Sequence, residues 1–445
     1  MGLKTFPGGI HSDDFKHFSK DSPIEVFPVP DRVIIPLSQH IGAPSKPLVK
    51  VGDQVKTGQK ICEAGGFVSI PMHASITGKV TKIGRFPHPI GNMQQGIEIT
   101  RTGEEEWVEL VDEANFMELP AEEMKNRISE AGICGMGGAG FPTHVKLSPP
   151  PDKKIDTVII NGVECEPYLT ADYRLMLERS EDILHGLRIF MKIVGATRGY
   201  IGIEANKPDA IFLYKDILAK ERNLDVVGLH LKYPQGAEKQ LIYACTKRKV
   251  PNRGGLPMDV GIIVQNVGTA IATYEAVRYK KPLIERIITV TGRIVNNPKN
   301  LQARIGTMFN ELLDYCEGTS EDIAKIISGG PMMGYAISTL NTPMAKGSSG
   351  LILFDINEAQ KRNEQTCIRC CSCVDVCPMN LMPSMIVSSV KHEDWESARH
   401  AGVIDCIKCG CCAYVCPAHI KMIQWIDIGK NKIIEIERKK KEKQS

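Results

Sequence analysis

Eight cysteines near the C-terminal end of the chain write one spacing twice. Each run reads C-x2-C-x2-C-x3-C and is followed directly by a proline, Pro378 in the first run and Pro417 in the second. Three thiolates on one tight loop can hold three irons of a [4Fe–4S] cube, and the fourth cysteine, carried onto the following helix, ligates the cube of the other loop. The spacing therefore predicts two clusters, whose ligand sets are Cys367, Cys370, Cys373 and Cys416 for one, and Cys406, Cys409, Cys412 and Cys377 for the other.

Zinc and disulfides are the alternatives to iron–sulfur clusters. Paired CxxC motifs also bind zinc, but two runs with the same 2-2-3 spacing and a trailing proline fit zinc poorly. An odd total of 15 cysteines without a recognisable signal peptide argues for a reducing compartment rather than disulfides. Cys371 and Cys411 lie inside the runs but off register, and we interpret them as non-ligands.

A glycine-rich segment, Ala131–Leu147, is the second candidate site. Its glycines Gly135, Gly137, Gly138 and Gly140 precede Phe141 and a proline, and Lys146 follows. Glycines let a backbone approach a ligand closely, and a loop lined by N–H groups with a lysine beyond it suits a phosphate. The segment departs from the dinucleotide-binding fingerprint, because no strand of conventional length precedes it.

Polar residues follow several predicted strands of the same region. Asn161, Glu164 and Glu166 come after a strand at Ile155–Ile160, and two later strands lead into further polar loops, with Tyr233, Gly236 and Glu238 in one and Asn266 and Thr269 in the other. Ligands bind outside the carboxyl ends of strands in open α/β sheets. We therefore expect these loops and the glycine segment to converge on one site.

Alternating strands and helices position these loops. Beyond residue 115 the pattern predicts strands at Gly199–Ile203, Val226–Leu231 and Asp259–Val264, and helices over Asp172–Val194, from Pro208, over Glu238–Thr246 and from Thr269. Such alternation is typical of a parallel sheet covered by helices, here a Rossmann-like domain over residues 116–281.

The flanking regions have different textures. Residues 1–115 predict an all-β domain, and Val49–Ile61 with His73–Ile83 resembles a lipoyl-type barrel-sandwich hybrid. The hairpin at 65–70, where carrier domains place a modifiable lysine, contains none, so we interpret the domain as a docking module. Residues 282–355 fit a β-grasp domain, with strands at Ile287–Val295, near Ala324–Ser328 and at Leu351–Phe354, and a helix at Met308–Tyr315. Residues 356–445 are predicted to be helical around the cysteine loops and to end in a basic tail.

Composition excludes several classes of function. Of the 445 residues, 42% are hydrophobic and 24% charged, which is ordinary for a globular protein. A net charge of +3 is too small to predict nucleic-acid binding. The apolar segments are all shorter than a membrane span.

Together these motifs resemble a known family. The segments GMGGAGFPTHVK, NGVECEP, YPQGAEKQ and QNVGTA resemble the NADH- and FMN-binding flavoprotein subunit of respiratory complex I. With the N-terminal FPGGIH, the segment PLSQHIGAPSKPLVKVGD and the doubled cysteine run, the whole chain resembles the RnfC family of Rnf complexes. This resemblance implies an SLBB-like type for the β-grasp domain, a two-[4Fe–4S] ferredoxin type for the last domain, FMN as cofactor and NAD(H) as substrate.

The resemblance also carries roles to individual residues. It implies that FMN is lined by Gly135, Gly137, Lys146, Asn161, Tyr233, Gly236, Glu238, Asn266 and Thr269. Phe141 would position the nicotinamide or adenine side of NADH, and Glu166 and Glu238 would contact NADH. Gly138, Gly140 and Glu164 complete the candidate set from the loop pattern. The chain departs from complex I at Val163 and Ala237, where complex I-like chains have acids. No side-chain base is nominated, because hydride transfer needs none.

The implied function is electron transfer between NAD(H), FMN and two clusters in a peripheral subunit of a membrane-bound, ion-translocating ferredoxin:NAD+ oxidoreductase. Its partners would be integral membrane subunits and a ferredoxin-like iron–sulfur subunit at the cytoplasmic face of the cell membrane, with membrane contact only through those partners. One alternative is a soluble flavin/iron–sulfur reductase, similar to cobalamin reductase or a proline-reductase-linked electron donor. Another is a non-enzymatic scaffold that carries clusters beside a vestigial nucleotide fold.

Overall fold

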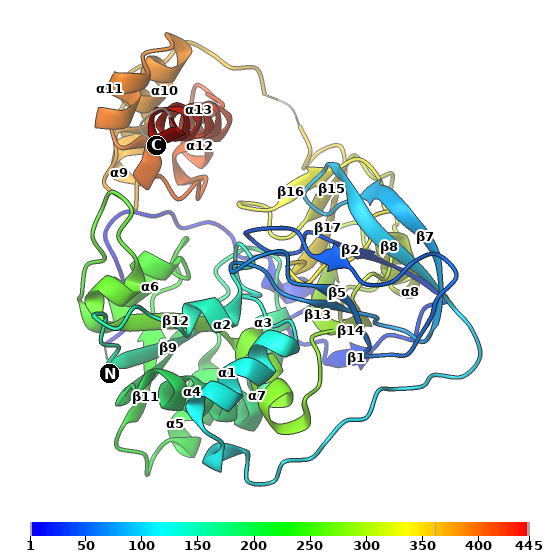
Figure 1. Ribbon diagram of the computed structural model, residues 1–445. Coiled ribbons are helices and arrows are strands. Elements are labelled where there is room, and N and C mark those ends of the chain that lie inside the picture. The colour runs from blue at the N-terminus through cyan, green and yellow to red at the C-terminus, as the bar shows by residue number, and fades with distance from the viewer. Residues whose placement is uncertain (1, 361, 443–445) are drawn as a thin grey trace.

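A computed structural model describes residues 2–360 and 362–442. The chain forms three β-containing units and one helical unit (Figure 1). The parallel sheet at the centre of the function has the strand order β11-β10-β9-β12. Its strands are β9 (Thr157–Gly162), β10 (Arg198–Glu204), β11 (Leu224–Leu229) and β12 (Ile262–Asn266). Their apolar, almost wholly buried residues are what a parallel sheet covered on both faces requires.

Helices cover this sheet and connect its strands. They are α1 (Ala121–Glu130), α2 (Thr143–Lys146), α3 (Ala171–Glu178), α4 (Ser180–Val194), α5 (Pro208–Ile217), α6 (Glu238–Thr246) and α7 (Val267–Tyr279). Short 3-10 turns precede α1 at Phe116–Glu118 and β12 at Pro257–Val260. The glycine segment lies between α1 and α2, so a helix precedes it where a dinucleotide-binding fingerprint has a strand.

Three element boundaries differ from those expected. The helix expected over 172–194 is two helices, because Arg179 leaves helical geometry (φ −131°, ψ 34°) and its guanidinium binds Asp182 and Glu275. The strand expected from Asp259 begins at Ile262, after Gly261 in left-handed conformation (φ 72°). The helix expected from Thr269 begins at Val267, because the Asn266 side chain accepts the N–H groups of Gly268 and Thr269.

The N-terminal unit consists of two small antiparallel sheets packed as a barrel-sandwich. Their strands are β2 (Arg32–Pro36), β3 (Lys46–Pro47), β4 (Gln54–Val55), β5 (Lys60–Glu63), β6 (Met72–His73), β7 (Gly78–Pro87) and β8 (Met93–Arg101). Val33 and Ile35 of β2 face Ile97 and Ile99 of β8, and all four are buried. The alternation that predicts this unit is therefore the alternation that fills its core.

The third unit is a six-stranded sheet with the order β1-β14-β13-β17-β15-β16. Its elements are β1 (Ile24–Val26), β13 (Glu285–Thr291), β14 (Lys299–Arg304), α8 (Phe309–Tyr315), β15 (Lys325–Ser328), β16 (Tyr335–Ile337) and β17 (Gly350–Phe354). The strand expected over 287–295 ends at Thr291, because Gly292 turns the chain with a φ of 139°. The strand β1 comes from the N-terminal segment, so this sheet is completed by residues almost 300 positions away.

The helical unit contains the cysteine runs and joins the rest through one extended connection after β17 (Figure 1). Its helices are α9 (Ser372–Asp375), α10 (Pro383–Lys391), α11 (Trp395–His400), α12 (Cys411–Tyr414) and α13 (Met422–Glu442), with a 3-10 turn at Val403–Asp405. Among the described residues, no helix combines the length and apolar character needed to cross a membrane.

The first 22 residues run across the other units before the barrel-sandwich begins (Figure 1). Lys4 forms a bridge with Leu229 at the end of β11, and Ile10 forms one with Tyr233. The N–H of Gly9 donates to the Val376 carbonyl in the first cysteine run (2.8 Å). We call residues 2–22 the N-terminal strap; it includes a 3-10 turn at Lys16–Phe18.

The strap is locked to two domains by a buried amide. The Asn300 side chain donates to the carbonyls of Ser19 (2.9 Å) and Ser22 (3.2 Å), and its oxygen accepts the hydroxyls of Thr170 and Thr289, both at 2.9 Å. Asn300 is fully buried. Each group left behind by its loss would be an unsatisfied buried polar atom.

We predict that Asn300→Ala lowers the free energy of unfolding by about 2–4 kcal/mol, because it orphans several buried partners at once. Thermal and denaturant unfolding followed by circular dichroism measure this. The matched control is Asn296→Ala, an exposed asparagine that donates to the Glu317 carbonyl, with an expected loss below about 1 kcal/mol. Equal losses in the two variants would contradict the prediction.

Candidate cofactor sites

The loops at the carboxyl ends of the parallel strands contact one another. The amide of Asn161 after β9 donates to the Gly236 carbonyl after β11 (2.8 Å). The N–H of Met136 in the glycine segment donates to the Thr269 hydroxyl on α7 (3.0 Å). Segments separated by more than 100 residues thus meet at one edge of the sheet, where a ligand of an open α/β sheet binds.

The glycine segment is held from two sides. The buried guanidinium of Arg286 on β13 donates to the Met136 carbonyl (2.8 Å). On the other side, Gly140 has a positive φ (70°) and would place a Cβ 3.1 Å from the Gln39 carbonyl oxygen of the barrel-sandwich unit. A Cβ on Gly137 would come within 2.9 Å of the Asn266 amide nitrogen, whereas one on Gly138 would meet nothing within 4 Å. The backbone at Gly138 is therefore open for a ligand to approach.

Several predicted contact residues already have protein partners. Asn161 accepts the Val163 N–H (3.2 Å), and the Asn266 amide donates to the Asp172 carboxylate (2.6 Å). Lys146 forms an ion pair with Glu238 (2.7 Å), and both side chains remain partly exposed. A phosphate bound by Lys146 would therefore share or open that pair. Phe141, at the end of the glycine segment, is 37% exposed and free to stack.

The two strand-end glutamates play different structural parts. Glu164 accepts the N–H groups of Asp172 (2.7 Å) and Tyr173 (3.3 Å) and so caps α3. Glu166 instead accepts the N–H groups of Met332 and Met333, both at 3.0 Å, from the turn between β15 and β16. Burial raises the pKa of Glu166 to about 7. Glu166 thus links the flavoprotein-like unit to the β-grasp unit.

Buried polar atoms without partners show where a ligand fits. Among the described residues, the fully buried Gln235 has no hydrogen-bond partner for either amide atom, and the same holds for Gln265 Nε2 and Thr143 Oγ1. Gln235 lies beside Gly236, Gln265 precedes Asn266, and Thr143 begins α2. Orphaned polar groups are rare in folded proteins. Their concentration around these loops fits a polar ligand such as FMN.

Sequence reasoning missed the buried cations of this site. Lys16, Lys207 and Arg286 are all buried and donate to backbone carbonyls of the glutamate loop or the glycine segment. They lie in three separate stretches of the sequence, and a single lysine or arginine in a polar context carries no periodicity that would mark it as buried. The conspicuous FPGGIH segment just before Lys16 was the available signal that the strap belongs to the site.

The cluster site predicted for Cys406, Cys409, Cys412 and Cys377 is called the inner site. These four cysteines line one cavity together with apolar side chains that include Leu381, Ile386, Ile423 and Ile426. Burial raises the pKa of the Cys377, Cys406 and Cys412 thiols, that of Cys406 to about 11. Thiolates in such surroundings need compensating positive charge, which the irons of a cluster supply.

The outer site is the one predicted for Cys367, Cys370, Cys373 and Cys416. Cys367 and Cys370 are exposed, whereas Cys373 and Cys416 are buried. In the described residues no three or more His, Cys, Asp or Glu side chains gather as a single metal ion would require. A mononuclear zinc site draws four ligands to within about 2.3 Å of one ion, whereas in a cube each thiolate binds a different iron.

The two off-register cysteines now have a physical account. Cys371 adopts a left-handed conformation (φ 62°) at the position where the second run has Gly410 (φ 83°). Each run thus needs a positive φ between its second and third ligands, and Cys371 tolerates it. Cys411 is fully buried and packs with Ile10 and Tyr233, where its thiol contacts the Tyr233 carbonyl (3.8 Å).

The inner site is attached directly to the strand-end loops. The buried Tyr233 hydroxyl donates to the Cys409 carbonyl (2.8 Å), and the Gln240 amide on α6 donates to the Pro378 carbonyl next to Cys377 (3.0 Å). Both halves of the inner site are therefore fixed to the unit that carries the glycine segment. Cys367 and Cys370 of the outer site lie at the solvent-exposed side.

Comparison with known proteins assigns each unit. Family models match as an RnfC barrel sandwich hybrid domain over residues 4–104, a Nuo51 FMN-binding domain over 128–275, an SLBB domain over 287–336 and a 4Fe-4S dicluster domain over 359–421. The expected domain types and their order are confirmed. The boundaries at 115, 281 and 355 stay predictions.

Curated relatives extend over the whole chain. The C subunit of the proton-translocating ferredoxin:NAD(+) oxidoreductase complex of Clostridium ljungdahlii is 51% identical over 95% of this chain and 93% of its own length. The chain belongs to the RnfC family of ion-translocating oxidoreductase complexes. The corresponding protein of the Na(+)-translocating complex of Acetobacterium woodii is 44% identical, with 98% of each chain covered. That of Rhodobacter capsulatus is 40% identical over 97% of this chain and 84% of its own.

A solved NAD+-reducing [NiFe]-hydrogenase, in its air-oxidized state, aligns with 65% of this chain and 56% of its own at a TM-score of 0.48 and 18% identity. The assignment to the RnfC family rests on the sequence relatives and confirms the family resemblance expected from the motifs.

The openness of the backbone at Gly138 gives a test of the FMN site. We predict that Gly138→Ala leaves the thermal stability of the FMN-free protein unchanged but weakens FMN binding at least about tenfold, because the new methyl group occupies ligand space only. Gly137→Ala should lower both quantities, since its methyl group collides with Asn266. Fluorescence quenching of FMN measures the affinity.

The matched control is Gly347→Ala, another open glycine outside the glycine segment, which should change neither quantity. Unaltered FMN affinity in Gly138→Ala would remove that glycine from the site.

Proposed function

We propose that this protein is the NAD(H)-oxidising and NAD+-reducing electron-transfer subunit of an ion-translocating ferredoxin:NAD+ oxidoreductase complex. Bound FMN would exchange hydride with NAD(H) and single electrons with the clusters, which resolves the mismatch between a two-electron and a one-electron carrier. The observation that carries the proposal is the hydrogen bond from Tyr233 to the Cys409 carbonyl, which joins the strand-end loops to a four-cysteine cavity. Membership in the RnfC family disfavours the free-standing reductase.

The residues divide the work as follows. The glycine segment with Lys146 would hold the FMN phosphate, and Asn266 with Thr269 would keep that segment against α7. Phe141 would stack on NADH, and Glu166, the NADH contact implied by the resemblance, would be oriented by the Met332 and Met333 N–H groups. The remaining candidate contacts belong to the same proposal: Gly135, Gly140, Glu164, Tyr233, Gly236 and Glu238.

The order of the clusters follows from their attachment. The inner site contacts Tyr233 through Cys409 and Cys411, and the N-terminal strap contacts the Cys377 side through Gly8 and Gly9. The outer site presents Cys367 and Cys370 to solvent. We therefore place the inner cluster next to the flavin and the outer cluster at the exit toward partner proteins. Those partners would be integral membrane subunits and a ferredoxin-like iron–sulfur subunit at the cytoplasmic face of the cell membrane.

Anaerobic reconstitution with iron, sulfide and FMN tests the function. NADH is expected to bleach flavin absorbance first and cluster absorbance second. Folded, cluster-replete protein that takes up no FMN, or whose flavin NADH fails to bleach, would refute the proposal and favour the scaffold alternative.

Single ligand substitutions test the order of the clusters. Cys367→Ser should remove the outer cluster and leave the inner one reducible by NADH. Cys377→Ser should remove the inner cluster, so that NADH reduces the flavin but no longer the outer cluster. Each variant should retain about four of the eight irons of two cubes.

The matched control is Cys371→Ser, an off-register cysteine of the same exposed loop, which should retain both clusters. NADH-dependent reduction of the outer cluster in Cys377→Ser, followed by low-temperature electron paramagnetic resonance, would reverse the proposed order.

A further inference from the structure

The glutamate loop, Val163–Leu169, is backbone-strained. Glu164 has a φ of 49° and Tyr168 a φ of 70°, a region that non-glycine residues seldom occupy. Such conformations persist only where the surrounding structure fixes them. The question is therefore what fixes this loop.

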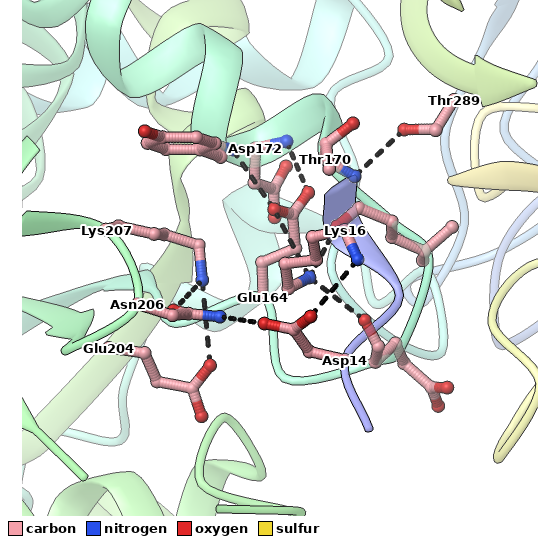
Figure 2. A network of polar contacts seen from close by, with 12 residues as sticks. Asp14, Lys16, Glu164, Thr170, Asp172, Glu204, Asn206, Lys207 and Thr289 are labelled. Carbon is pink, nitrogen blue, oxygen red and sulfur yellow. Dashed lines mark hydrogen bonds and ion pairs between the residues drawn. The ribbon is translucent and has the colours of Figure 1, made fainter. Parts of the chain in front are cut away.

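Two buried ammonium groups hold it from beneath, as Figure 2 shows. Lys16 of the strap donates to the carbonyls of Glu166 (3.1 Å) and Leu169, and Lys207 donates to the Val163 carbonyl (2.7 Å). The Tyr168 N–H donates to the Asp14 carbonyl (2.8 Å), again from the strap. The strap thus supplies most of the contacts that fix the loop between Glu166 and Leu169.

Lys16 also places its charge among the loop carboxylates. Its ammonium lies 3.8 Å from the Glu164 carboxylate, and the two side chains are only 4% and 5% exposed. Asp14 turns back onto Lys16 through the Lys16 N–H (3.2 Å) and binds the Asn206 amide (3.1 Å), so the lysine is anchored on its own side as well. At this burial, charge-assisted hydrogen bonds are strong and their loss is expensive.

We propose that Lys16 is a positioning residue for the NADH-contacting glutamate loop, supplied in trans to the nucleotide domain by the N-terminal strap. It sets the backbone conformation that directs Glu166, and its charge stabilises the ionised carboxylates beneath the nucleotide. This inference rests on the proposed function, because it takes Glu166 to face NADH.

The electrostatics agree with that geometry. Burial raises the pKa of Glu166, whereas the Lys16 ammonium lowers it, so removing the ammonium should move the ionisation to higher pH. The other charged or titratable groups around the loop are Asp14, Glu164, Cys165, Asp172, Glu204, Lys207 and Tyr233. Lys207 and Lys16 are the cations of this group, and Lys16 is the one that contacts Glu166 itself.

The test compares Lys16→Met and Lys16→Gln with wild type in the complete, reconstituted protein, using NADH oxidation with ferricyanide as acceptor. Both neutral variants should raise KM for NADH about tenfold or more, the scale expected for charge-assisted hydrogen bonds, with a smaller effect on kcat. The inflection in the pH profile of kcat/KM should move to higher pH, while FMN and iron content stay at the wild-type level.

Lys4→Met is the matched control, because Lys4 lies on the same strap and its ammonium contacts only the Cys245 carbonyl at 3.4 Å. It should keep the wild-type KM and pH profile. Neutral Lys16 variants that behave like Lys4→Met would overturn the inference, as would failure of both to fold while Lys16→Arg folds with wild-type kinetics, which assigns Lys16 to stability alone. Absence of NADH oxidation in wild type itself would instead refute the proposed function.

Discussion

The hydrogen bond from Tyr233 to the Cys409 carbonyl is the interaction on which the functional organisation depends. Electrons move between a nucleotide site and a cluster only if the two are held close, and the cysteine unit joins the β-grasp unit through one extended connection (Figure 1). Without further attachment that connection would let the clusters move away from the sheet. Tyr233, buried and packed against Ile10 and Cys411, fixes the inner cluster loop at the carboxyl end of β11.

The other contacts of this junction support the same geometry from different directions. Gln240 holds the Cys377 side, and the Val376 carbonyl accepts the Gly9 N–H of the strap. Glu166 reaches the Met332 turn, which in turn lies against Gly410 of the inner loop. Four parts of the chain therefore meet within one polar and sulfur-containing cluster, and a displacement of any one of them would be felt by the others.

Much of this could be read from the sequence, for physical reasons that differ between regions. The cysteine spacing specifies its chemistry locally, because the ligands of one loop lie within a few residues. The helix Glu238–Thr246 and the strand Arg32–Pro36 were predicted at their observed ends, since both have clear apolar periodicity and end signals. The position of the strap was not predictable, because Lys16 contacts residues about 150 positions away and its own segment is neither periodic nor apolar. The break at Arg179 was hidden for a similar reason: its cause is an ion pair with the distant Glu275.

The charge balance beneath the nucleotide site explains why buried lysines are needed there. FMN and NADH both carry phosphates, yet the strand ends present the buried carboxylates Glu164, Glu166, Asp172 and Glu204. Burial raises the pKa of each of them, which suppresses part of their negative charge near neutral pH. Lys16 and Lys207 offset much of the remainder through ion pairs at 3.8 Å and 3.6 Å with Glu164 and Glu204. An acidic loop can thus orient NADH through its hydrogen bonds without repelling the phosphates held by the glycine segment, provided that both cations stay in place.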